Sequence, residues 1–110
     1  MTNSRQNLVS EDLSVNPVTH QVSQNGHRIK LPDLSYKTLM VLIDNAPNSV
    51  SIDQLIDLVW GEVEVSPETV TQRIALLRKS LSANNTKTEY ISSIRNQGYR
   101  WVPEIGRAHV

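Results

Sequence analysis

The stretch "SPETVTQRIALLRKSL", Ser66 to Leu81, decides the fold because it predicts a helix with one buried and one exposed face. Ser66 can cap this helix, Pro67 fits its first position, and Glu68 complements the positive end of the helix dipole. A rotation of about 100° per residue places four apolar residues in one narrow stripe. We expect a helix over 67–82 whose buried seam is Val70, Ile74, Leu77 and Leu81.

The opposite face of this helix lacks the paired Glu and Lys residues that usually keep an exposed helix soluble. Its small, amide and basic side chains suit a DNA groove instead. Packing on a protein partner through Ala75 and Leu76 is the alternative interpretation. The residues of this face are Thr69, Gln72, Ala75, Leu76 and Lys79, with Arg73 and Arg78 on its flanks.

A hairpin follows the helix. The stretch "SIRNQGYRWV", residues 93–102, predicts two short strands around a turn at 96–98, with Arg95 and Arg100 on either side of the turn. A hairpin beside a polar helix face can extend an arginine toward phosphates or into a minor groove.

Two further helices precede Ser66. In the first, Tyr36, Leu39, Met40 and Ile43 have helical spacing, and Pro47 stops the helix. The second is expected over 52–59, because Ser51 and Gln54 have capping-box spacing and Gly61 can terminate the helix.

Short β-rich runs between Leu13 and Leu31 predict an antiparallel sheet with strands near 13–15, 21–23 and 27–30, the last two joined at Asn25-Gly26. The predicted fold class is therefore α+β: a winged helix-turn-helix with an N-terminal antiparallel β-sheet, three helices and a C-terminal β-hairpin wing. We expect a flexible N-terminus over 1–10 and a DNA-binding domain over 11–103, divided into the sheet (11–32) and the helices and wing (33–103).

Composition restricts the function. The 110 residues contain no Cys, which excludes disulfide scaffolds, thiol nucleophiles and cysteine-ligated zinc. The net charge is zero, but residues 1–65 hold four basic and eight acidic residues, whereas residues 66–110 hold seven and three. A polyanion would meet the second half, although such asymmetry also arises by chance in short chains.

No catalytic constellation occurs in the sequence. Gly-rich phosphate loops and nucleophile elbows are missing, and His20 and His27 have no third ligand beside them, which favours surface histidines over a metal site. We expect no enzyme activity, no cofactor, no metal and no small-molecule ligand.

Three motifs together resemble a known family: "VSIDQLIDLVWG" (50–61), "TVTQRIALLRKSL" (69–81) and "YISSIRNQGYRWV" (90–102). They are similar to the effector domain of OmpR/PhoB-type transcription regulators, most closely the ToxR/CadC-like membrane-bound variant. The resemblance implies sequence-specific binding of double-stranded DNA by a bacterial transcription regulator, with the third helix in the major groove. The alternative is a winged-helix module for protein interaction or self-association without DNA binding.

The resemblance also implies roles for individual residues. Glu62 and Glu64 would lie in a loop that can touch RNA polymerase, or are simply solvated acids. Arg78 could instead form an ion pair within the protein. Family members usually have Glu at the position of Ser35 and basic residues at those of Ala75 and Leu76, so the operator does not transfer. The implied base contacts are Thr69, Gln72, Arg73 and Leu76, the backbone contacts Ser66, Arg78, Lys79 and Arg100, and the minor-groove contact of the wing Arg95.

The last seven residues, "EIGRAHV" (104–110), resemble the translated start of a sequencing adapter and are predicted to be a non-native tail. The gene is then expected to continue past Pro103. In ToxR/CadC-like proteins such a continuation holds a linker, a membrane helix and a periplasmic sensor. The implied location is the cytoplasm, with the full-length protein anchored in the inner membrane and a homodimer forming on DNA.

Overall fold

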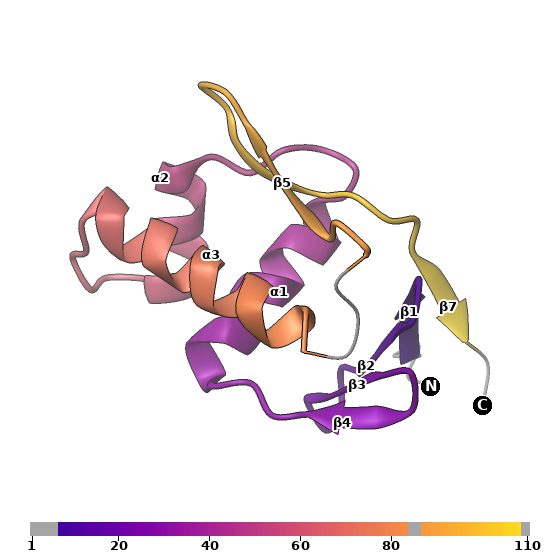
Figure 1. The fold of residues 1–110 in the computed structure, drawn as a ribbon. Coiled ribbons are helices and arrows are strands. Elements are labelled where there is room, and N and C mark those ends of the chain that lie inside the picture. Colours follow the sequence, from indigo (N-terminus) through magenta and orange to yellow (C-terminus); the bar gives the residue numbers. More distant parts are fainter. Residues whose placement is uncertain (1–6, 84–86, 109–110) are drawn as a thin grey trace, which may run out of the picture.

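A computed structural model of the chain describes residues 7–83 and 87–108. A five-stranded sheet lies beside a group of helices, and a separate two-stranded hairpin extends beyond the helices (Figure 1). The predicted α+β class, with an N-terminal antiparallel sheet, three helical segments and a C-terminal hairpin, is confirmed. None of the helices in the described ranges is long and apolar enough to cross a membrane.

The sheet has the strand order β4-β3-β2-β1-β7, and all neighbouring strands are antiparallel. Asn25 and Gly26 have φ angles of 52° and 81° and join β3 to β4 in the tight turn that the sequence predicts. The strands are β1 (Asn7–Ser10), β2 (Leu13–Asn16), β3 (Gln21–Gln24), β4 (His27–Ile29) and β7 (Gly106–Ala108).

The predicted flexible N-terminus over 1–10 is wrong for residues 7–10, which form β1. This strand pairs with β2 on one side and β7 on the other, and it buries Leu8 and Ser10. Its partner β7 comes from the far end of the chain, so a local sequence pattern could not reveal the pairing. β7 lies in the segment predicted to be a non-native tail. Residues 1–6 and 109–110 lie outside the described part of these two segments.

The helices are α1 (Asp33–Asn45), α2 (Ile52–Leu55), η1 (Ile56–Trp60) and α3 (Pro67–Leu81). Ser51 and Gln54 form the expected capping box, since each side chain accepts from the other residue's amide. The second helix nevertheless does not continue as a regular α-helix to residue 59. It widens into the π-helical turn η1, in which the Gly61 amide donates to the Ile56 carbonyl at 3.1 Å.

The core forms around the seam of α3, which is buried as predicted at Val70, Ile74, Leu77 and Leu81. The predicted stripe of α1 is incomplete, because Leu42 is fully buried whereas Met40 is only partly buried. α1 contacts α3, η1 and the hairpin, so it buries a wider arc than one stripe.

The hairpin consists of β5 (Ile91–Ile94) and β6 (Gly98–Trp101), and we call it the wing. Val50, between α1 and α2, bridges to β6: its amide donates to the Tyr99 carbonyl at 2.7 Å, and the Tyr99 amide donates back at 2.9 Å. Gly98 makes this approach possible. It has φ 115°, and a Cβ there would lie 1.9 Å from the Val50 carbonyl oxygen.

We predict that Gly98→Ala destabilises the domain far more than Gly26→Ala, although both glycines have positive φ. Gly26 has no atom within 4 Å of an added Cβ, so its replacement should cost only the conformational strain of about 1 kcal/mol. Gly98→Ala adds a backbone clash and should cost at least about 3 kcal/mol. Urea unfolding measures the stability of both variants. Equal losses of stability would show that the close approach of Val50 to Gly98 is not needed for folding stability.

Candidate nucleic-acid interface

The face of α3 opposite the buried seam is open to solvent. Gln72, Ala75, Leu76 and Lys79 are exposed, and half of the Leu76 surface is accessible. No acidic residue occurs from Thr69 to Ser82. We call Thr69, Gln72, Ala75, Leu76 and Lys79 the α3 outer face; it combines an amide, a hydroxyl, a cation and apolar groups without a carboxylate that would repel phosphate.

The first turn of α3 is fixed by its cap. The Ser66 hydroxyl accepts from the Thr69 amide at 3.4 Å and lies 3.3 Å from the Thr69 hydroxyl. Ser66 and Thr69, predicted to contact the DNA backbone and a base respectively, therefore lie together at the helix start. Free amides of the first turn and the helix dipole favour an anion at this end.

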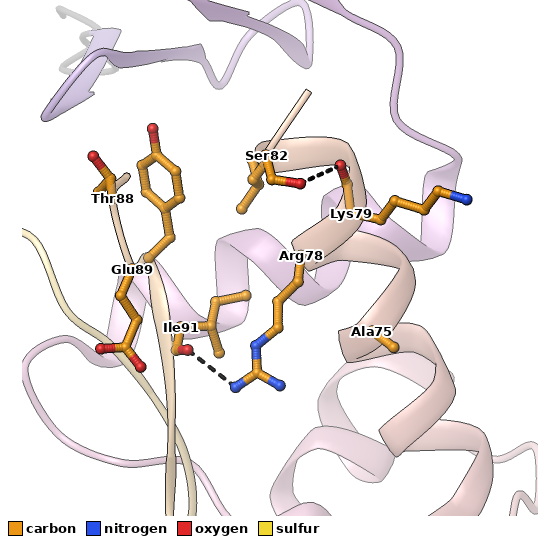
Figure 2. A pocket seen from close by; sticks show the side chains of 9 residues that line it. Ala75, Arg78, Lys79, Ser82, Thr88, Glu89 and Ile91 are labelled. Atoms are coloured by element: carbon orange, nitrogen blue, oxygen red, sulfur yellow. Dashed lines mark hydrogen bonds between the residues drawn. The ribbon is translucent and has the colours of Figure 1, made fainter. Parts of the chain in front are cut away.

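Arg78 fastens the wing to α3. Its guanidinium donates to the Ile91 carbonyl at 3.0 Å and to the Ser93 hydroxyl at 3.1 Å, and its central carbon lies 5.7 Å from the centre of the Tyr99 ring. Figure 2 shows Arg78 directed from α3 toward Ile91. These contacts tie the exposed Arg78 side chain to the wing through neutral partners.

Arg73 is held between two helices. Its guanidinium donates to the Ser35 hydroxyl of α1 at 3.1 Å, and Ser35 is 1% exposed. The Nε atom of Arg73 is buried and has no hydrogen-bond partner among the described residues. Arg73 thus lies beside the α3 outer face with its side chain directed toward α1.

The wing carries two arginines in different settings. Arg95 is exposed and begins the turn, which the Gln97 amide closes by donating to the Ile94 carbonyl at 2.9 Å. Arg100 pairs across the ladder with Ser92, whereas Ser93 pairs with Tyr99. Because side chains alternate along strands, Arg100 lies on the other face of the wing from Ser93 and Tyr99, which contact Arg78. The structure therefore does not bring Arg100 to the side of the wing that faces α3.

A groove of about 450 Å³ lies between the last turns of α3 and the start of β5. Arg78 and Lys79 line it together with Glu89, so its charge is mixed. In Figure 2 Lys79 is directed away from β5, whereas Arg78 is directed toward Ile91. Both side chains are exposed, but Arg78 also bonds to the wing, whereas Lys79 is directed outward.

Glu62 and Glu64 are exposed in the loop after η1. Val63 between them is 60% exposed, and Leu58 on η1 is 59% exposed. The sequence pattern indicated the two acids but not the two apolar side chains. Isolated apolar residues in a loop give no sequence signal, and Leu58 is exposed although its neighbour Val59 is buried.

The described residues contain no group of three potential metal ligands among His, Cys, Asp and Glu. His20 stacks on Tyr36 with ring centroids 4.5 Å apart, so the structure gives this ring a packing partner.

The chain resembles known proteins over most of its length. The family "Transcriptional regulatory protein, C terminal" matches residues 26–101. The transcriptional regulator HilA of Salmonella typhimurium is 32% identical over 98 residues, which cover 89% of this chain and 17% of HilA. The transcriptional activator CadC of Escherichia coli is 36% identical over 93 residues, which cover 83% of this chain and 18% of CadC.

Solved structures agree with these matches. The DNA-binding domain of E. coli CadC has a TM-score of 0.85 at 28% identity and covers 96% of this chain and 100% of that domain. The DNA-binding domain of Klebsiella pneumoniae RstA, solved in complex with the RstA box, has a TM-score of 0.76 at 27% identity. The match covers 86% of this chain and 95% of that domain. The chain spans less than a fifth of HilA and of CadC.

We predict that Arg78→Ala lowers the free energy of unfolding by about 1–3 kcal/mol, because it removes two hydrogen bonds and an aromatic contact. Lys79→Ala, one residue along the same helix, should cost less than about 0.5 kcal/mol. Urea unfolding compares the stabilities, and hydrogen exchange at the β5 amides reports on the wing. If both variants lose equally little and β5 stays protected, Arg78 does not fasten the wing.

Proposed function

This chain belongs to the family of C-terminal domains of transcriptional regulatory proteins, of OmpR/PhoB type and CadC-like, and we propose that it binds specific operators with α3 in the major groove and the wing on the minor groove or backbone. The observation that supports this arrangement is the exposed α3 outer face, free of acids, beside an arginine-tipped wing. An α-helix fits the major groove, where each base pair presents a distinct pattern of donors, acceptors and methyl groups. No catalytic step is part of the proposal.

Base recognition is assigned to residues near the middle of the α3 outer face. The Gln72 amide can pair with the N6 and N7 atoms of adenine, and Leu76 can contact a thymine methyl. Thr69 would contact a base or sugar near the helix start. Arg73 belongs at the edge of this set, because it can reach a base only by releasing Ser35.

Backbone contacts are assigned to the residues that border this face. Lys79 and Ser66 would contact phosphates from the two ends of α3, and Arg78 from the cleft between α3 and the wing. Arg100 would contribute only where DNA reaches the outer face of the wing. Arg95 extends from the wing tip and can enter a narrow minor groove or hold a phosphate.

The main test compares Gln72→Ala with Arg95→Ala, using a duplex selected from a random library and a random duplex, over a series of salt concentrations. Gln72→Ala should cost about 1–3 kcal/mol on the selected duplex and much less on random DNA, because it removes a base contact. Arg95→Ala should weaken binding to both, and it should reduce the slope of log affinity against log salt by about 0.9 if it holds one phosphate.

Three outcomes contradict parts of this assignment. Equal losses of Gln72→Ala on both duplexes would show that Gln72 recognises no base. An unchanged affinity and salt slope in Arg95→Ala would remove the wing tip from the interface. A salt-independent affinity of the unaltered chain would favour the alternative of an apolar interface through Leu76, whose exposure is the observation behind it.

We propose that two copies bind adjacent half-sites as a homodimer on DNA and that Glu62 and Glu64 contact RNA polymerase. We also propose that the domain (11–103, together with β1) acts in the cytoplasm, within a longer protein that is anchored in the inner membrane. Residues 104–110 are proposed to be non-native. Titration of purified polymerase with a Glu62→Ala, Glu64→Ala double variant tests the polymerase contact.

We predict that the chain binds a duplex with two half-sites more tightly than one with a single half-site. One helix and one wing cover few base pairs, and the formal charge of zero gives little long-range attraction. Fusion to a dimerising coiled coil should then tighten binding through effective concentration. Titrations on both duplexes, with the mass measured in parallel, check this, and equal affinities without a gain on fusion would mean that one copy suffices.

A further inference from the structure

Gln24, the last residue of β3, is 0% exposed although its side chain is polar. Its Nε2 donates to the Leu81 carbonyl at 2.5 Å and to the Tyr90 hydroxyl at 2.9 Å. The Tyr90 hydroxyl donates in turn to a carboxylate oxygen of Asp12. One buried amide therefore joins the sheet to residues that lie 57 and 66 positions further along the chain.

The two acceptors of Gln24 occupy the common base of α3 and the wing. Leu81 is the last residue of α3, and the last carbonyls of a helix have no partner within that helix. Leu81 is also 1% exposed, so its carbonyl needs a donor from the protein. Tyr90 immediately precedes β5, and its ring lies 5.5 Å from that of Trp101 on β6. Gln24 thus contacts the end of the helix and the entry to the wing at once.

The amide at this position has opposing effects on stability. The Oε1 atom of Gln24 is buried without a hydrogen-bond partner among the described residues, which is unfavourable. An apolar side chain of similar size would remove this unpaired Oε1, but it would leave the buried Leu81 carbonyl without its donor. The reverse amide orientation would set Oε1 against the Leu81 carbonyl oxygen, acceptor against acceptor, so the geometry requires Nε2 there. What the amide adds is direction: its two N–H groups fix where the Leu81 carbonyl and the Tyr90 hydroxyl lie.

We propose that Gln24 is a positioning residue for DNA binding. Without touching DNA, it fixes the position of the C-terminal end of α3 relative to the wing. It thereby fixes the position of Lys79, near the end of α3, relative to Arg95 at the wing tip. This inference rests on the proposed function, in which α3 and the wing contact one duplex together. If the end of α3 were displaced, the proposed DNA contacts of α3 would no longer be aligned with those of the wing.

The test uses the full chain with Gln24→Met, which keeps the side-chain volume and removes both donors. Ser10→Ala is the matched control, because Ser10 makes the other buried polar link of the sheet. The Ser10 hydroxyl accepts from the Trp101 indole at 2.9 Å and donates to the Glu104 carbonyl at 2.8 Å, but it does not contact α3. Binding is measured where urea unfolding shows all variants to be folded.

Gln24→Met should raise the Kd for the selected duplex about fivefold to twentyfold, the effect of about one lost hydrogen bond in the alignment of the interface. It should also accelerate hydrogen exchange at amides 78–82 more than at 70–75. Ser10→Ala loosens a link between the sheet and β6 but none to α3, so it should leave exchange at amides 78–82 unchanged even where it lowers stability as much.

Two results overturn the inference: an unchanged Kd of Gln24→Met, or an exchange increase spread evenly over the domain, which would make Gln24 a general stabilising residue. The exchange measurement does not involve DNA. If the unaltered chain shows no preference for any duplex, the proposed function fails together with the DNA-binding role of Gln24. Localised exchange at 78–82 would then support only its placement of the helix end.

Discussion

The burial of the α3 seam is the contact on which the rest of the structure depends. Val70, Ile74, Leu77 and Leu81 are each at most 1% exposed and belong to the same core as α1, α2 and the base of the wing. Burial of such side chains contributes roughly 1.5–3 kcal/mol each, so rotating α3 about its axis by even one residue would forfeit much of the core. The orientation of the α3 outer face follows from this constraint, because Gln72 and Leu76 are exposed on the side opposite the seam.

The same packing divides the basic residues of α3 into two groups. Arg73 and Arg78 extend toward neighbouring elements and donate to Ser35, Ile91 and Ser93. Lys79 extends outward, although it is only one residue further along the helix than Arg78. Arginine suits these two positions because its planar guanidinium can donate to several acceptors at once. The positive charge in this half of the chain is therefore partly structural, so a count of basic residues overstates what DNA can use.

Local chemistry made part of this structure predictable. The cap at Ser66, the seam of α3, the Ser51–Gln54 capping box and the turn at Asn25-Gly26 each depend on residues within a few positions of one another, and each was predicted. Features that need a distant partner were missed: β1 pairs with the end of the chain, the wing is bridged by Val50, and Gln24 reaches Leu81. For Gln24 one signal did exist, since it lies two residues after Val22 and so faces the same side of the strand. The candidate base-contacting face was likewise predictable from helical spacing, whereas the inward contacts of Arg73 and Arg78 depend on the elements packed beside α3.

The attachment of the wing differs along its length, and this has a consequence for recognition. Near its base, the Val50 bridge, the bonds of Arg78 and the link from Trp101 to Ser10 all fix the wing before any ligand is present. A binding surface that is already ordered loses less conformational entropy on association, so the helix and the wing base are suited to discriminating between bases. The tip around Arg95 is exposed, and its turn is closed by the Gln97 amide. An exposed arginine at such a tip can adjust to the width of a groove or the path of a backbone, which vary with DNA sequence. In the proposed complex, direct recognition of bases would therefore be concentrated on α3, and adaptation to DNA shape on the wing tip.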